Sequence, residues 1–206
     1  LETYRFDIFA SSIYEFAWHE YCDWYLELTK SLLWNEEIDP ELKRATQRTL
    51  LEVLETLLRT THPVMPFITE TLWQQVAPRL GIIQGPANST NNSLMLQSFP
   101  DPTQIVNDPA AEEQIEWLKA VITGIRNIRG EMNIAPGKPL PVLLQNGSAT
   151  DQTYLTDNTV YLHKLGRLDS ITWLNSEDTT PESAIALLGE MKILIPMAGL
   201  IDKDAE

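Results

Sequence analysis

The chain opens with a long stretch in which apolar residues recur at helical spacing. Positions three or four apart define one apolar stripe, made of Phe6, Phe9, Ile13, Phe16, Ala17, Trp24 and Leu28. Four further aromatic residues follow an adjoining face: Tyr14, Trp18, Tyr21 and Tyr25. The pattern predicts a helix from about residue 3 to residue 32, with most of its aromatic side chains in the core of a helical bundle.

Two Asp-Pro pairs, Asp39-Pro40 and Asp108-Pro109, predict the starts of later helices. Each combines a favourable N-cap residue with proline at the first helical position. Another helix is expected to begin near Pro66, and residues 81–93 read as a loop. The apolar stripes predict inward-facing residues on the three helices: Leu42, Leu50, Val53, Leu54, Leu57 and Leu58 on the first of them, Phe67, Ile68, Leu72, Trp73 and Val76 on the next, and Ile115, Leu118, Val121, Ile122, Ile125 and Ile128 on the last.

After Gly130 the period of the pattern changes. Short apolar runs predict strands at residues 140–144, 170–174, 185–188 and 192–197, and residues 153–168 have helical spacing. The expected fold is therefore mainly α. A helical bundle in residues 1–133 is followed by a small α+β subdomain in residues 134–206.

Charge changes this picture by restricting where a polyanion could bind. The net charge is −14, so most of the surface repels phosphate. Between two acidic stretches, however, Lys119, Arg126, Arg129 and Lys138 are accompanied only by Glu131. Any nucleic-acid contact is confined to such basic islands.

Cysteine content and hydropathy indicate the cellular compartment. The one cysteine, Cys22, excludes an internal disulfide framework and is typical of a reducing compartment. No stretch approaches the roughly 20 apolar residues of a membrane span. We expect a cytoplasmic protein without membrane contact.

The motifs of common enzymes are absent from the sequence. It has no glycine-rich phosphate loop and no nucleophile elbow. His19 and Cys22 are three positions apart, but a zinc site needs about four ligands and no second pair is present. We therefore expect no catalytic residue and no metal site.

Binding candidates are stronger. Trp34, beside Lys30 and Asn35, follows the first helix at a polar break. An exposed aromatic ring close to a cation suits a base that is splayed out of a single strand. The alternative is that Trp34 caps the bundle core. Lys43 and Arg44 open the next helix and are further candidates, unless they belong to a solvated face.

The second candidate region surrounds the end of the helix that starts at Pro109. Arg126 and Arg129 are three apart and are expected to share a face, with Asn133 and Lys138 close by. These side chains could bind the phosphates of a nucleic-acid backbone. The alternative is a salt bridge to Glu131 or to the acidic carboxyl-terminal part.

Several stretches resemble, in order, the C-terminal region of the bacterial valyl-tRNA synthetases, which are class I aminoacyl-tRNA synthetases. They read FDIFASSIYEFAWHEYCDWYLELTK, LLEVLETLLRTTHPVMPFITETLWQQV, WLKAVITGIRNIRGEMNIAPGKPL and ILIPMAGLID. The resemblance implies a helical domain that binds the anticodon end of a valine-specific tRNA. It implies a parent enzyme that joins valine to tRNA with ATP and magnesium and that also edits mischarged threonine.

The resemblance also sets limits. Neither the HIGH-type nor the KMSKS-type catalytic sequence occurs here, so this fragment is expected to lack aminoacylation and editing. It implies a first bundle helix before Leu1, a coiled-coil arm beyond residue 206, contact with the rest of its own polypeptide, and a monomer. A non-catalytic helical scaffold, which docks a protein through exposed Phe6, Phe9 or Trp18, is the alternative function.

The resemblance assigns a functional role to only a few individual residues of this chain. Where the family usually has Lys-Pro, this chain has Lys30-Ser31, which leaves the first helix freer to continue. The anticodon-loop contact is expected at Lys30, Trp34 and Asn35. Four further residues match a family motif, either as RNA contacts or as structural links: Arg126, Arg129, Asn133 and Lys138.

Overall fold

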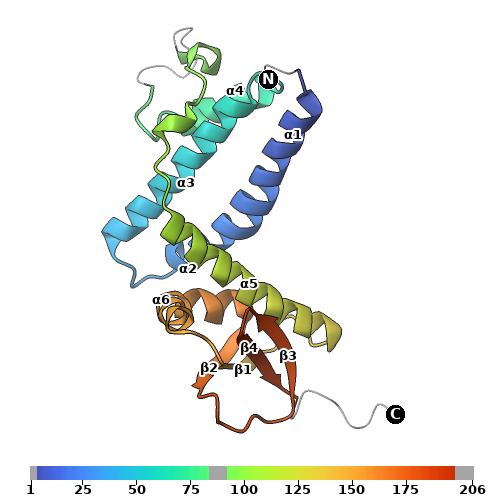
Figure 1. Cartoon of the computed structure of the whole chain (residues 1–206). Coiled ribbons are helices and arrows are strands. Elements are labelled where there is room, and N and C mark those ends of the chain that lie inside the picture. Colours follow the sequence, from blue (N-terminus) through green and yellow to red (C-terminus); the bar gives the residue numbers. More distant parts are fainter. Residues whose placement is uncertain (1–3, 84–91, 198–206) are drawn as a thin grey trace. The chain divides into compact units, whose positions relative to one another are not determined.

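The chain forms two compact units, Leu1–Val106 and Asn107–Glu206 (Figure 1). The computed structural model describes residues 4–83 and 92–197. Most of the loop expected at residues 81–93 and the tail from residue 198 lie outside the described residues. Helices dominate, and a four-stranded sheet lies in the second unit. The expected class, a mainly α fold with a small α+β part, is confirmed.

The first helix forms as predicted, although it is not a uniform α-helix. It consists of α1 (Phe6–Glu15), the π-helical segment η1 (Phe16–Leu26) and α2 (Glu27–Leu33). Tyr21 and Leu28 are buried, but α1 contains no buried residue. The expectation of a core stripe is wrong at Phe6 and Phe16, which are both exposed. Phe9, Ile13 and Phe16 of this stripe line an open cavity against α3 (Pro40–Thr61), so the stripe faces its neighbour without being packed against it.

The core of the first unit lies instead around α3 (Pro40–Thr61) and α4 (Pro66–Val76). The Asp39 carboxylate caps α3 by accepting a hydrogen bond from the Glu41 backbone nitrogen at 3.2 Å, as the Asp-Pro signal predicts. Two short 3-10 turns follow, η3 (Leu94–Leu96) and η4 (Pro102–Gln104). The buried cluster comprises Leu58, Trp73, Val76, Ala77, Ile83 and Leu94.

The predicted core is wrong in two places. Leu42, near the start of α3, is exposed; on α4, Phe67 is 88% exposed, and Ile68 and Leu72 are also exposed. The last three lie on α4 beside the fully buried Trp73, so the helix itself was predicted correctly. The apolar pattern indicates which faces of a helix favour burial, whereas burial also requires a neighbour on that face.

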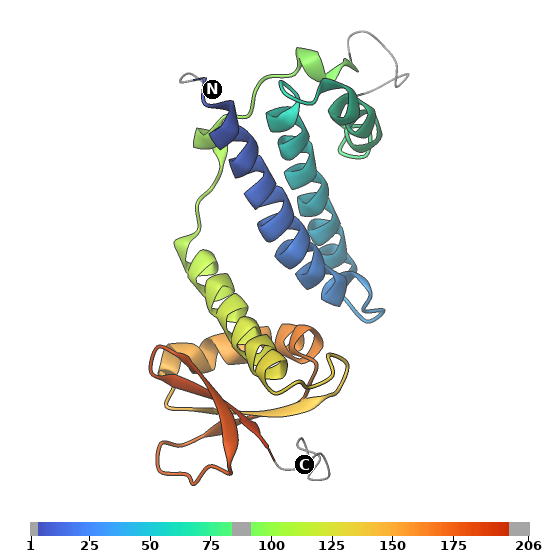
Figure 2. The same cartoon turned by 90° about the vertical axis from the view of Figure 1, so that its right-hand side faces the viewer.

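The second unit is a sheet with helices on one face (Figure 2). Its elements are α5 (Pro109–Glu131), β1 (Leu140–Gln145), α6 (Ala149–Gly166), β2 (Leu168–Leu174), β3 (Ser183–Leu188) and β4 (Met191–Pro196). The strand order is β2-β1-β4-β3. β1 and β2 are parallel and are connected through α6, whereas β4 pairs antiparallel with both β1 and β3. All four predicted strands are confirmed.

Helix α5 belongs to this second unit because it packs on β3 and β4. A methyl group at Gly124 would lie 3.2 Å from Ile193 Cδ1, so glycine there permits the close approach. The predicted core stripe of α5 is buried from Leu118 to Ile128, whereas Ile115 is 37% exposed. The division of the chain thus differs from the boundary expected between residues 133 and 134. No helix in residues 4–83 or 92–197 has the length and apolar character needed to cross a membrane.

Candidate nucleic-acid interface

Trp34 follows directly after the long first helix, and its side chain is 76% exposed. Helix α2 continues through Ser31 and ends at Leu33, so the absence of proline after Lys30 does not displace the tryptophan from the helix end. Lys30 Nζ lies 5.8 Å from the centre of the Trp34 ring, within cation–π range, and also pairs with Glu27. The exposure excludes a role for Trp34 as a cap of the core.

The other candidates of the first unit lie around the short loop between α2 and α3. Asn35 Oδ1 accepts a hydrogen bond from the Glu37 backbone nitrogen at 3.1 Å, so the asparagine shapes the loop. Lys43 is half-buried and Arg44 is exposed near the start of α3. All five predicted residues of this unit therefore flank one loop, which also carries the exposed Glu36.

In the second unit the two candidate arginines differ. Arg126 is exposed, whereas Arg129 is only 7% exposed. The Arg129 guanidinium donates hydrogen bonds to four backbone carbonyls at 3.4, 2.8, 3.0 and 2.9 Å, those of Ala135, Lys138, Gly166 and Arg167. The expectation that both arginines share one accessible face is corrected: Arg129 holds the turn after α5 against the end of α6. Its partners are carbonyls rather than Glu131.

The turn after α5 carries Asn133 and Lys138, with both side chains exposed. Asn133 has a left-handed backbone (φ 54°), which asparagine tolerates better than most residues. A cavity of about 540 Å³ here is lined by Arg126, Arg129, Asn133 and also Arg167.

Arg167 was missed in the sequence because no spacing pattern connects it to α5. The parallel pairing of β1 with β2, which begins with Leu140 opposite Leu168, brings the end of α6 to this place. Burial, and secondly the charge of Arg167, lower the pKa of Arg129. Arg129 nevertheless stays charged at neutral pH, since an arginine side chain does not lose its proton in proteins.

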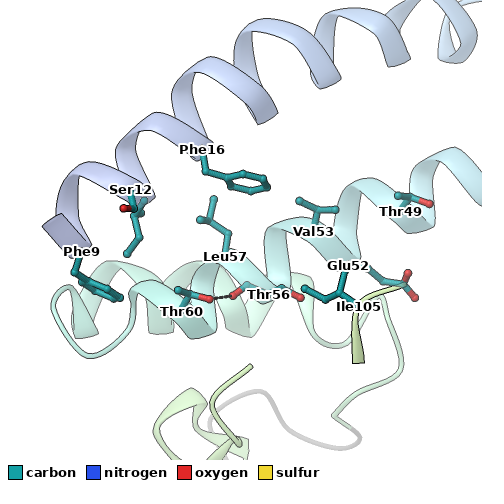
Figure 3. Close-up of a pocket in the computed structure, with 11 residues that line it drawn as sticks. Phe9, Ser12, Phe16, Thr49, Glu52, Val53, Thr56, Leu57, Thr60 and Ile105 are labelled. Carbon is teal, nitrogen blue, oxygen red and sulfur yellow. Dashed lines mark hydrogen bonds between the residues drawn. The ribbon is translucent and has the colours of Figure 1, made fainter. Parts of the chain in front are cut away.

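An apolar cavity of about 620 Å³ lies between the first helix and α3 (Figure 3). Phe16 and Leu57 project toward each other there. The other lining residues are largely apolar or carry hydroxyl groups: Phe9, Ser12, Ile13, Thr49, Glu52, Val53, Thr56, Thr60 and Ile105. This surface offers packing rather than acid–base chemistry.

The three histidines occupy structural or solvent-facing positions. His62 Nδ1 lies 2.8 Å from Thr69 Oγ1, and His163 Nδ1 lies 3.0 Å from the Leu168 carbonyl oxygen. His19 lies within 4 Å of carboxylates on both sides, at 3.8 Å from Glu15 and 3.4 Å from Asp23. Within the described part of the chain, no group of three or more His, Cys, Asp or Glu residues is placed to hold a metal ion.

Comparison with known proteins places this architecture in a family. A valine–tRNA ligase from Xanthomonas axonopodis pv. citri (strain 306) is 45% identical to the chain over 206 residues. The aligned region covers 99% of this chain and 21% of that protein, so the chain spans about a fifth of the length of this relative. Residues 1–144 match the family described as the anticodon-binding domain of tRNA ligase. The match takes in the whole first unit, α5 and most of β1, and the chain therefore belongs to the family of anticodon-binding domains of tRNA ligases.

Proposed function

We propose that this chain is the tRNA-binding part of a valine–tRNA ligase and that it binds the anticodon stem and loop. The observation that carries the proposal is the 45% identity to a valine–tRNA ligase along 99% of the chain. The parent enzyme would attach valine to its tRNA with ATP and magnesium. That chemistry would reside in the rest of the polypeptide, because neither catalytic signature of the class occurs in these residues. The proposal includes a cytoplasmic location and a monomeric parent.

The loop between α2 and α3 is the proposed contact for an anticodon base. Trp34 supplies an exposed aromatic ring on which a splayed base can stack, and Lys30 lies beside it. Lys43 and Arg44, near the start of α3, supply positive charge for the adjoining phosphates. The Oδ1 atom of Asn35 accepts a hydrogen bond that shapes the loop, and its side-chain amide nitrogen is the proposed donor to the RNA.

In the second unit the proposed contacts are Arg126 on α5 and Asn133 and Lys138 in the turn that follows. Arg129 supports this turn through its bond to the Lys138 carbonyl.

Replacing Trp34 with alanine tests the base-stacking role. Loss of one aromatic stacking contact costs about 1–3 kcal/mol, so the dissociation constant for valine-specific tRNA is expected to rise by roughly five- to 150-fold. Fluorescence anisotropy titration with labelled tRNA at low salt measures the change. Affinity should also fall as salt rises, since phosphate contacts release counterions.

A matched control is Trp18→Ala, which removes an equally large aromatic side chain that is 53% exposed on the same long helix. Trp18 stacks on Tyr14, at 6.3 Å between ring centres, and is not beside the loop. This variant should bind tRNA like the unaltered protein. Equal losses in both variants would argue against Trp34 as a specific stacking residue, and no binding by any form at low salt would refute the proposed function.

A second candidate function is a docking scaffold for another protein or for the rest of its own polypeptide. The apolar cavity between the first helix and α3, together with exposed Phe6 and Trp18, favours it. Sedimentation velocity distinguishes the two functions. Self-association that added tRNA does not change would support docking, whereas a monomer that forms a complex with tRNA supports the first proposal.

A further inference from the structure

A basic cavity lies between the carboxyl ends of α5 and α6 in the second unit. Its volume of about 540 Å³ is in the range usual for ligand pockets. Its polar side chains come from Arg126, Arg129, Asn133 and Arg167. The remaining lining residues are glycine or apolar, namely Gly130, Ile134, Pro136, Leu165 and Gly166. None of the described residues that line the cavity is acidic, although the whole chain carries a net charge of −14.

Arg129 fixes the walls of this cavity. It bonds the carbonyls of Ala135 and Lys138 on one side and those of Gly166 and Arg167 on the other. The carboxyl end of a helix carries partial negative charge, which offsets part of the positive charge of Arg129. Arg129 is therefore a positioning residue. The other two guanidinium groups that line the cavity belong to Arg126 and Arg167.

Arg167 holds an unfavourable position. It follows α6 with a left-handed backbone (φ 52°, ψ 52°), where glycine is the usual residue. A large side chain in this conformation stores backbone strain, and strain of this kind is concentrated at functional sites. In addition, the positive charge of Arg167 repels that of Arg129. An anion between the arginines would remove that repulsion.

We propose that this cavity binds a phosphate group, with Arg126 and Arg167 as direct ligands and Asn133 as an additional hydrogen-bond donor. The planar guanidinium group matches two phosphate oxygens at once, which is the reason arginine is favoured for phosphate recognition. The inference rests on the proposed function in one respect, since it takes the phosphate to be part of the tRNA backbone. Free inorganic phosphate offers the same chemistry, and the experiment separates the two sources.

The variant Arg167→Gly in the full chain tests the proposal. Glycine relieves the backbone strain and keeps the carbonyl that accepts from Arg129, so the melting temperature should be unchanged or higher. Binding to tRNA should weaken by about tenfold. The plot of log affinity against log salt should become shallower by about one, as for the loss of one phosphate contact. Arg126→Ala, on the regular helix α5, should reproduce the loss of tRNA affinity and the shallower salt dependence.

Lys164→Ala is the matched control, because it removes one exposed positive charge from α6 outside the cavity lining. Its tRNA affinity should change by less than about twofold. In parallel, inorganic phosphate is titrated into isotope-labelled protein at constant ionic strength. The Nε–H resonances of Arg126 and Arg167 should shift in the unaltered protein.

The outcomes are distinguishable. If tRNA binds but both cavity variants keep its affinity and salt slope, and phosphate leaves the arginine resonances unmoved, the inference is overturned and the proposed function stands. If phosphate moves these resonances while the variants bind tRNA normally, the cavity binds free phosphate and the assignment of the phosphate to the tRNA backbone is overturned. If the unaltered protein does not bind tRNA but phosphate moves the resonances, the proposed function fails and the phosphate site is supported.

Discussion

Replacing Arg129 with alanine is expected to lower the free energy of unfolding of the second unit by about 3 kcal/mol. The substitution removes all four hydrogen bonds, two to carbonyls in the turn after α5 and two to carbonyls at the end of α6. The bond to the Gly166 carbonyl is buried, and a buried carbonyl that loses its donor keeps its desolvation penalty, so this loss exceeds the net value of an ordinary hydrogen bond. Urea unfolding followed by circular dichroism measures the change, and amide hydrogen exchange in β1 and α6 locates it in this unit.

The control for Arg129 is Arg126→Ala, three positions earlier on the same helix. Arg126 is exposed, so its removal should change the free energy of unfolding by no more than about 0.5 kcal/mol. The two substitutions are thus expected to differ in effect: Arg129→Ala should impair folding, and Arg126→Ala should impair only the proposed tRNA binding. Equal and small effects on unfolding would contradict the structural role of Arg129.

These two residues also show where sequence reasoning about the site is limited. Helical spacing correctly identified the buried Ile125 and Ile128. It could not separate Arg126 from Arg129, because the separation comes from a turn that folds over one side of the helix end. Arg167 contributes a carbonyl to Arg129 from 38 positions further along the chain, and only the pairing of β1 with β2 brings it there. A site assembled by tertiary contacts leaves no local pattern.

The positions of the helices were easier to predict than the burial of their side chains. Asp39-Pro40 and Asp108-Pro109 predicted helix starts because capping is a local interaction, and both aspartates accept a backbone hydrogen bond as expected. Burial of the aromatic first helix was predicted only in part. Tyr21 is buried and its hydroxyl donates to the Leu50 carbonyl at 2.9 Å, whereas Trp18 is 53% exposed. The difference depends on which neighbour each side chain meets, and periodicity does not contain that information.

The core of the first unit depends most on Trp73, a fully buried residue of α4. Its indole nitrogen lies 3.3 Å from the carboxylate of Glu55, which is itself buried and pairs with Arg59 at 2.7 Å. Arg59 also donates to the Ser98 carbonyl at 3.0 Å. One tryptophan therefore fills the space between α3 and α4 and hydrogen-bonds to a charged pair that anchors a later segment.

Replacing Trp73 with alanine should therefore lower the free energy of unfolding of the first unit by about 3–5 kcal/mol, the usual cost of truncating a large buried aromatic side chain. Trp73→Phe keeps most of the volume but removes the indole N–H, so its loss should be smaller and should reflect the bond to Glu55. Trp34→Ala makes the same truncation at a 76% exposed site and should change the unfolding free energy by no more than about 0.5 kcal/mol. Urea unfolding of the three variants measures these differences. A loss below about 1 kcal/mol for Trp73→Ala would show that the α3–α4 cluster is not what stabilises this unit, since complete burial would then carry no cavity cost.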